Sequence, residues 1–140
     1  MSDATVPDGF LPHDRTSPLT APWEPIYARR EADRLRLGLE VRRPHTNSRG
    51  LLHGGLIAAL ADNAMGLSVA LVLEGEERRP AKGLVTSSLS VDFLGRAELG
   101  QWLEVDTAFV HAGGSQAVAQ AFVTADGAVI ARADATFRFA

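Results

Sequence analysis

The chain of 140 residues contains no cysteine. A disulfide framework, a cysteine-ligated metal site and a catalytic thiol are therefore all excluded. An excess of charge is also missing, because 17 acidic and 14 basic residues leave a formal net charge of -3. That balance argues against a surface for nucleic acid. At this length, with 46% hydrophobic residues, the sequence fits a single domain with a sizeable core.

Several recognisable signals are absent as well. The first 20 residues lack the basic start and apolar centre of a secretory signal, so we expect a cytoplasmic protein. The four histidines have no metal-ligand spacing, and no dinucleotide-binding or phosphate-loop fingerprint occurs. We therefore expect neither a metal nor an organic cofactor. The stretch "GGSQA" misses the nucleophile-elbow pattern by its last residue and lies at an apparent hairpin, which argues against a serine triad.

The order of patterns along the chain predicts how it is organised. Five of the seven prolines lie within the first 25 residues, so we expect residues 1–32 to form an N-terminal segment that is extended or loosely docked. Residues 33–140 are expected to form the domain. Alternating apolar and polar residues predict a strand over residues 33–43. Four further strands, expected to pair antiparallel, are predicted by the patterns of residues 84–94, 102–110, 116–124 and 129–139.

The run "LLHGGLIAALADNAMGLSVALVLEG", residues 51–75, is apolar on more than one face of a helix. By periodicity alone it is either a buried helix or a membrane span. Asp62 near its middle would be costly in a bilayer, and the remaining chain has the pattern of amphipathic strands, so we expect a helix packed in its own sheet and no membrane contact. The predicted fold class is α+β, with one antiparallel sheet wrapped around a long central helix. Such a helix and sheet leave apolar surface that a monomer covers poorly, which favours a homo-oligomer.

Asp62 and the glycines that open the helix are the leading candidates for chemistry. No lysine or arginine accompanies Asp62 on its helix, and a buried carboxylate must be paired, protonated or functional. The alternative is a partner from a distant strand or a second subunit. Gly54 and Gly55 place free amides at the positive end of the helix, which can bind an oxyanion. The alternative is that these glycines only allow a tight entry to the helix.

Three other residues near this helix are weaker candidates. Asn47 could hydrogen-bond a substrate or water, although asparagine in a loop is usually a turn former. His53 could act as acid or base, but we favour a structural role in capping or orienting the loop. Thr86, on the strand after the helix, could orient a water molecule. A basic cluster beyond the helix could bind phosphates or simply solvate a loop; its members are Arg78, Arg79 and Lys82.

The residues from Asn47 to Asp62, "NSRGLLHGGLIAALAD", resemble the signature of the hotdog-fold acyl-CoA thioesterases, specifically the phenylacetate-pathway type. The later stretch "SVDFLGRAELGQWLEV" is similar to the strand and turn after the helix in that family. The resemblance implies a hotdog fold and hydrolysis of an acyl-CoA thioester to a free acid and CoA, without a metal. It implies that Asp62 is the general base or nucleophile and that the Gly54 amide polarises the carbonyl. Asn47 and His53 would be its neighbours, and Thr86 the water-orienting hydroxyl.

Two other functions remain open at this point. One is a non-catalytic acyl-CoA-binding or regulatory domain of the same fold, against which the acid at position 62 argues. The other is a hotdog enoyl hydratase or dehydratase, which should pair a histidine with an acid in another arrangement. The acyl group is not specified, although residues such as Met65 and Phe93 would suit an aromatic or medium-chain acid.

The spacing of the two main candidates predicts how the site is assembled. Eight residues separate Gly54 from Asp62, which is roughly 12 Å along one helix. A base and an oxyanion donor must both lie within about 3 Å of the reacting groups. We therefore expect a homodimer with two shared sites, each using Gly54 of one subunit and Asp62 of the other, and a dimer of dimers remains an alternative.

Overall fold

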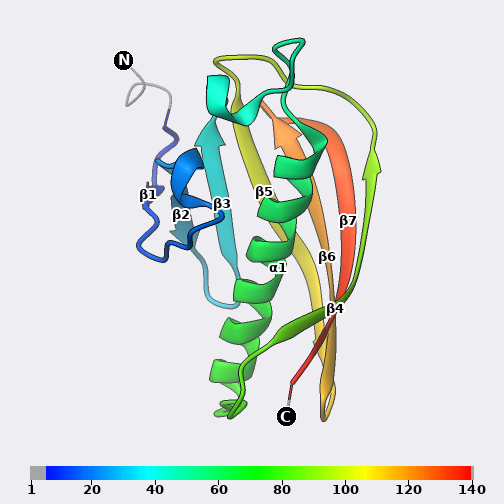
Figure 1. The fold of residues 1–140 in the computed structure, drawn as a ribbon. Coiled ribbons are helices and arrows are strands. Elements are labelled where there is room, and N and C mark those ends of the chain that lie inside the picture. Colours follow the sequence, from blue (N-terminus) through cyan, green and yellow to red (C-terminus); the bar gives the residue numbers. More distant parts are fainter. Residues whose placement is uncertain (1–5, 140) are drawn as a thin grey trace.

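The computed structural model describes residues 6–139, which form one helix lying across one antiparallel sheet (Figure 1). The elements are β1 (Leu11–Pro12), the short 3-10 helix η2 (Ala21–Trp23), β2 (Tyr27–Arg30), β3 (Leu35–Glu40), the 3-10 helix η3 (Arg43–His45), α1 (Gly54–Gly75), β4 (Val85–Phe93), β5 (Trp102–Ala112), β6 (Gln116–Ala125) and β7 (Ala128–Arg138). The seven strands have the order β1-β2-β3-β5-β6-β7-β4. The predicted α+β hotdog architecture is confirmed.

Helix α1 begins three residues later than the apolar run because His53 adopts extended backbone as its N-cap. The His53 ring accepts the Gly55 N–H at 2.8 Å through Nδ1, which satisfies one of the free amides of the first turn. By length and composition alone α1 could span a membrane, but half of its most apolar window is buried within the chain. It is the central helix of this sheet, as predicted.

The core lies between α1 and the concave face of the sheet. Leu60, Met65 and Val69 of α1 are completely buried, as are Leu37 of β3 and Leu103 of β5. Burying each side chain of this size stabilises the fold by about 1.5–3 kcal/mol relative to exposure. Met65 therefore belongs to the core, and the suggestion that it lines an acyl pocket was wrong. Its position in the helix places it on the sheet side rather than on the open side.

The N-terminal segment is more structured than its prolines suggested. Strand β2 pairs with β3, with Tyr27 opposite Gly38, and β1 pairs with β2. The Phe10 ring meets the Trp102 ring edge-on at 5.2 Å between centroids, and Tyr27 lies 6.0 Å from the same indole. The segment predicted to be extended thus supplies two strands to the sheet, because contacts with Trp102 compensate for weak local propensity.

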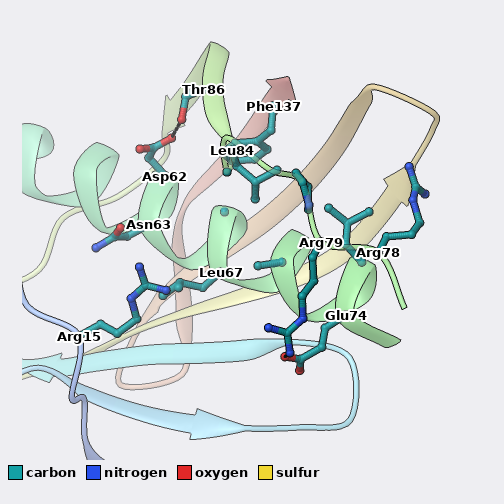
Figure 2. A pocket seen from close by; sticks show the side chains of 15 residues that line it. Arg15, Asp62, Asn63, Leu67, Glu74, Arg78, Arg79, Leu84, Thr86 and Phe137 are labelled. Carbon is teal, nitrogen blue, oxygen red and sulfur yellow. Dashed lines mark hydrogen bonds and ion pairs between the residues drawn. The ribbon is translucent and has the colours of Figure 1, made fainter. Parts of the chain in front are cut away.

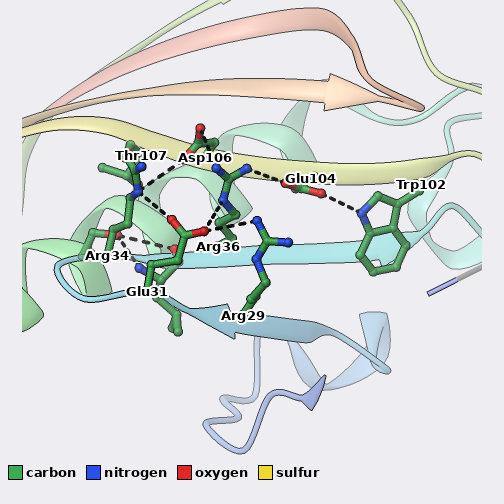
Figure 3. A network of polar contacts seen from close by, with 10 residues as sticks. Arg29, Glu31, Arg34, Arg36, Trp102, Glu104, Asp106 and Thr107 are labelled. Atoms are coloured by element: carbon green, nitrogen blue, oxygen red, sulfur yellow. Dashed lines mark hydrogen bonds and ion pairs between the residues drawn. The ribbon is translucent and has the colours of Figure 1, made fainter. Parts of the chain in front are cut away.

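A network of charged side chains reinforces the junction of the N-terminal segment with the outer face of the sheet (Figure 3). Glu31 accepts hydrogen bonds from Arg34 at 2.9 Å and Arg29 at 3.1 Å. Arg36 of β3 donates to Glu104 of β5 at 2.8 Å. The hydrogen bond from Arg34 is the main cause that lowers the pKa of Glu31, against a smaller opposing effect of burial. The network joins the β2–β3 turn and β3 to β5.

Strand β4 forms the second edge of the sheet and is open to solvent. Large apolar side chains project from it, with exposed fractions of 64% for Val85, 38% for Leu89 and 55% for Phe93. An open edge with apolar side chains is a common place for another strand to pair. The sequence had suggested uncovered apolar surface on the sheet face and the helix, whereas these exposed side chains lie on an edge strand.

Candidate active site

Asp62 and Thr86 are in contact (Figure 2). Asp62 was the leading candidate for a catalytic residue in the sequence, and Thr86 was one of the weaker candidates. The Thr86 hydroxyl donates to Asp62 Oδ1 at 2.7 Å. Thr86 lies near the start of β4, where the strand passes α1. Asp62 is half-buried within one chain rather than buried, so its expected full burial was wrong for the single subunit. The carboxylate is oriented by the hydroxyl and retains access to solvent.

The pair stands in a groove of about 580 Å³ between α1, the start of β4 and the N-terminal segment. Its apolar wall consists of Leu67, Ala70, Leu73, Leu84 and Phe137. Arg15, Asn63 and Arg79 add polar groups to the groove. Figure 2 shows Asp62 and Thr86 well apart from Arg78 and Arg79 along α1. An elongated ligand with a reactive centre beside Asp62 would fit this shape.

The start of α1 offers one free backbone donor. The Gly55 N–H is taken by His53, whereas the Gly54 N–H has no acceptor among residues 6–139. A Cβ at Gly54 would lie 3.2 Å from two ring carbons of Phe93, and one at Gly55 would lie 3.0 Å from His53 Nδ1. Close packing is therefore a second explanation for glycine at each of these two positions. The helix dipole and the free amide together make Gly54 a suitable oxyanion donor.

Asn47 and His53 hold the loop that leads into α1. Asn47 Oδ1 accepts the N–H groups of Arg49 at 2.9 Å and Leu51 at 3.2 Å, so this side chain closes a turn. No hydrogen bond among residues 6–139 uses Asn47 Nδ2. His53 occupies the N-cap, where a structural role was favoured. A contact of Asn47 with substrate stays a prediction.

The three basic residues beyond the helix have different surroundings. Arg78 donates to the carbonyl oxygens of Gly113 and Gly114, and its guanidinium lies 5.4 Å from the Phe139 ring centroid. Arg78 is therefore already engaged with the β5–β6 turn and with Phe139, which follows β7. Arg79 is 87% exposed and forms only a loose ion pair of 3.8 Å with Glu74. Arg79 and exposed Lys82 are the two that remain available for a ligand phosphate.

Two residues that line the groove were not predicted as site residues. Arg15 comes from the proline-rich N-terminal segment and lines the groove beside Leu67. Asn63 follows Asp62 on α1 and is exposed. A lone arginine in a segment without periodicity gives no signal in the sequence, whereas Asn63 is visible there as the second polar residue in the apolar run but was given no role.

Within one chain, the Asp62 carboxylate and the Gly54 N–H are too far apart to contact one bound carbonyl group together. Thr86 lies beside Asp62, while the donor at Gly54 is eight residues away on α1, or about 12 Å. Histidines and carboxylates do not gather in any group of three or more that could hold a metal ion within residues 6–139.

The chain is similar in sequence and in fold to several known proteins. The model of the thioesterase superfamily matches residues 49–131. A Pseudomonas aeruginosa protein named "Putative esterase" is 37% identical over 133 residues, covering 94% of this chain and 96% of that protein. A Streptococcus mutans protein bound to acetyl CoA is 25% identical, with a TM-score of 0.74 over 91% of this chain and 94% of that one. A Streptococcus pneumoniae protein named as a hypothetical thioesterase, with coenzyme A, has a TM-score of 0.72 at 23% identity, over 84% and 90% of the two chains.

Proposed function

The chain belongs to the thioesterase superfamily, and we propose that it hydrolyses an acyl-CoA thioester to a free carboxylic acid and CoA. The observation that carries this proposal is the hydrogen-bonded pair of Thr86 and Asp62 in the groove. Its substrate class is supported by two structural neighbours, one bound to acetyl CoA and one to coenzyme A.

The pair supplies what hydrolysis requires. Because the Thr86 hydroxyl donates to Oδ1, Oδ2 of Asp62 is left to act on water as a general base or on the carbonyl carbon as a nucleophile. In the first route water adds to the carbonyl while its proton passes to Asp62, and collapse of the tetrahedral oxyanion expels CoA thiolate. In the second route Oδ2 attacks the carbonyl carbon, the C–S bond breaks and CoA thiolate leaves, and water then hydrolyses the acyl-aspartyl anhydride. Both routes need a donor for the carbonyl oxygen.

We assign this donor to the Gly54 N–H of a second subunit, and β4 indicates how the two subunits meet. On β4, Thr86 contacts Asp62 and Phe93 packs against Gly54. Two copies of β4 paired antiparallel about an axis at Ser90 would set Thr86 opposite Phe93 of the partner subunit. Each Asp62 would then face the Gly54 amide of the partner subunit. Thr86 and Phe93 each lie three paired positions from Ser90. Ser87 is not counted, because β4 is irregular there and Thr86 and Ser88 pair with successive residues of β7.

The surfaces required by this arrangement are available. The apolar side chains of β4 are exposed along the free edge, and Ala58, midway between Gly54 and Asp62, is half-buried and small enough for a second helix to approach. The proposed unit is a homodimer with two shared sites. Pairing of two such dimers into a tetramer is compatible with it.

We further propose that the groove carries the CoA arm toward Arg79 and Lys82. Within residues 6–139, Arg79 has only the 3.8 Å ion pair with Glu74 and Lys82 is exposed, and the phosphates of CoA are the anionic part of the substrate. Phe93 packs against Gly54 outside the groove lining, so we assign it to the acyl side of the partner's site.

The hydrolysis is tested by incubating the purified protein with a panel of acyl-CoAs and a thiol reagent. Since the chain has no cysteine, every thiol that appears comes from CoA. Release of CoA with multiple turnovers supports the proposal. Tight binding without turnover would point to a binding module, and a change in enoyl absorbance without thiol release would point to a hydratase.

The shared site is tested by complementation between two inactive variants. Asp62→Ala removes the base, and Gly54→Pro removes the amide donor at a helix position that often tolerates proline. In a mixed dimer one site collects both defects and the other collects neither. Since half of randomly paired dimers are mixed, roughly a quarter of wild-type activity should return. Verified mixed dimers without recovered activity would refute the shared site.

A further inference from the structure

His45, one of the four histidines of the chain, is buried in η3 with an exposed fraction of 1%. Its ring nitrogens are both occupied. Nδ1 accepts the Arg42 N–H at 2.9 Å, and Nε2 lies 2.8 Å from the carbonyl oxygen of Trp23, to which it donates. Trp23 belongs to η2 in the N-terminal segment. The imidazole thus joins that segment to the loop that leads into α1.

The backbone of the same residue reaches the start of the helix. The His45 carbonyl oxygen accepts the His53 N–H at 2.9 Å, and His53 is the N-cap residue directly before Gly54. An unbroken chain of contacts therefore runs from Trp23 through His45 to His53. Gly54, the helical residue that directly follows His53, is the one whose N–H has no acceptor among residues 6–139.

We propose that His45 is a positioning residue, which holds the base of the loop over residues 42–53 so that the Gly54 N–H points at the reacting carbonyl. The proposal rests on the proposed thioesterase function. Asn47 closes the tip of the same loop, whereas His45 fixes its base against the N-terminal segment. A displacement of about 1 Å in a group of this kind can cost about 100-fold in rate.

The two hydrogen bonds require a neutral imidazole with its proton on Nε2, because Nδ1 faces an N–H donor. Burial is the main cause that lowers the pKa of His45, and the nearby Arg42 charge acts in the same direction, while the Trp23 carbonyl opposes both. The Arg42 guanidinium itself donates to the carbonyl oxygens of Trp23 and Glu24. The neutral form is thus the one that this environment stabilises.

Three variants separate the two bonds. His45→Leu removes both, His45→Gln keeps an amide donor near the place of Nε2, and His45→Asn keeps an acceptor near the place of Nδ1. We expect kcat of His45→Leu to fall by about 10–100-fold with KM within about 2-fold of wild type. His45→Gln and His45→Asn should each recover part of that loss. If His45→Leu does not fold, the test rests on the other two variants. A kcat lowered by about 3–10-fold in His45→Gln and His45→Asn, with KM unchanged, would then support the positioning role.

Ser68→Ala is the matched control for lost stability. Ser68 is completely buried, and its hydroxyl bonds the backbone of Leu35 on the sheet side of α1, away from the helix start. We expect this variant to melt at a lower temperature with an unchanged kcat. If folded His45 variants keep wild-type kcat, or if Ser68→Ala loses as much kcat at equal loss of stability, the positioning role is overturned.

A measurement without substrate separates this inference from the proposed function. In an ¹⁵N-labelled protein, the Gly54 amide resonance should shift in the His45 variants, and hydrogen exchange of the His53 N–H, which the His45 carbonyl accepts, should accelerate. Both should stay the same in Ser68→Ala. A Gly54 amide unchanged in all His45 variants would overturn the positioning role, whatever the wild type hydrolyses. A changed amide in a protein that releases no CoA would instead contradict the thioesterase.

Discussion

A cross-linking experiment at Ser90 tests the proposed pairing of two β4 strands. If the two-fold axis passes at this residue, the two copies of Ser90 lie directly opposite each other. Directly opposite Cα atoms in antiparallel strands are about 4.5–5.5 Å apart, and a disulfide spans about 4.4–6.8 Å. Ser90→Cys should therefore form a covalent dimer under mild oxidation. No other cysteine exists in the chain to compete.

Strand geometry explains why a cysteine at residue 90 should cross-link and a cysteine elsewhere on β4 should not. A residue one position from the axis moves about 3.3 Å in each copy, in opposite directions. The two Cα atoms are then offset by about 6.6 Å along the strands and lie about 8 Å apart, beyond the reach of a disulfide. Ser88, a serine on the same strand two paired positions away, is farther still. Ser88→Cys is therefore a matched control that should stay uncross-linked.

The assay is a non-reducing gel after oxidation, with light scattering to show that each variant is dimeric beforehand. A mixture of Ser88→Cys and Asp92→Cys chains should cross-link, because the proposed register sets these two residues opposite each other. The Ser90→Cys dimer should keep thioesterase activity, since residue 90 lies outside the groove. Faster cross-linking of Ser88→Cys than of Ser90→Cys, or none in a dimeric sample, would refute the register.

Three further outcomes follow from the site and the surface network. Asp62→Asn should keep the fold by circular dichroism and lose about 100-fold or more in kcat; a rate near wild type would make Asp62 structural. Replacing Arg79 and Lys82 with alanine should raise KM for acyl-CoA in low salt, but not for thioesters without phosphates; an equal change for both substrates would remove the phosphate contact. Glu31→Gln should lower Tm by about 2–4 °C at neutral pH. Because Arg34 lowers the pKa of Glu31 below its usual 4.5, the stabilisation is complete above that pH and is lost as the pH falls through the folded-state pKa. A difference in Tm that persists in acid would exclude this ion pair as its cause.

The helix and the last strands could be predicted because their apolar periodicity coincides with burial. The run before Gly75 predicted α1, and the alternating residues after position 84 predicted β4 to β7 within about two residues at each end. Strands β1 and β2 could not be predicted, because side chains far away in the sequence hold them. Phe10 and Tyr27 meet Trp102, which lies more than 70 residues farther along.

The sequence nominated candidate residues for the site by their types, but it could not show their contacts. An acid in an apolar helix indicated chemistry at Asp62, and its hydrogen bond to Thr86, 24 residues later, needed the fold. Arg78 and Arg79 are adjacent and look equivalent in the sequence. In the fold, only Arg78 donates hydrogen bonds to the turn between β5 and β6, and this contact could not be predicted. His45 gave no sign of its role, because both of its partners are backbone groups that any sequence provides.

The two edges of the sheet are unequal, and this limits how far the sheet can grow. Strand β1, at one edge, is two residues long and includes Pro12, which has no N–H to offer a further strand. The opposite edge is the nine-residue β4 with its free backbone groups. A chain that exposed two long edges could add copies without end and build a filament. Among residues 6–139, β4 is the one long free edge. If two copies pair through β4 as proposed, neither copy has a second long edge to offer, and assembly by strand addition would terminate at two.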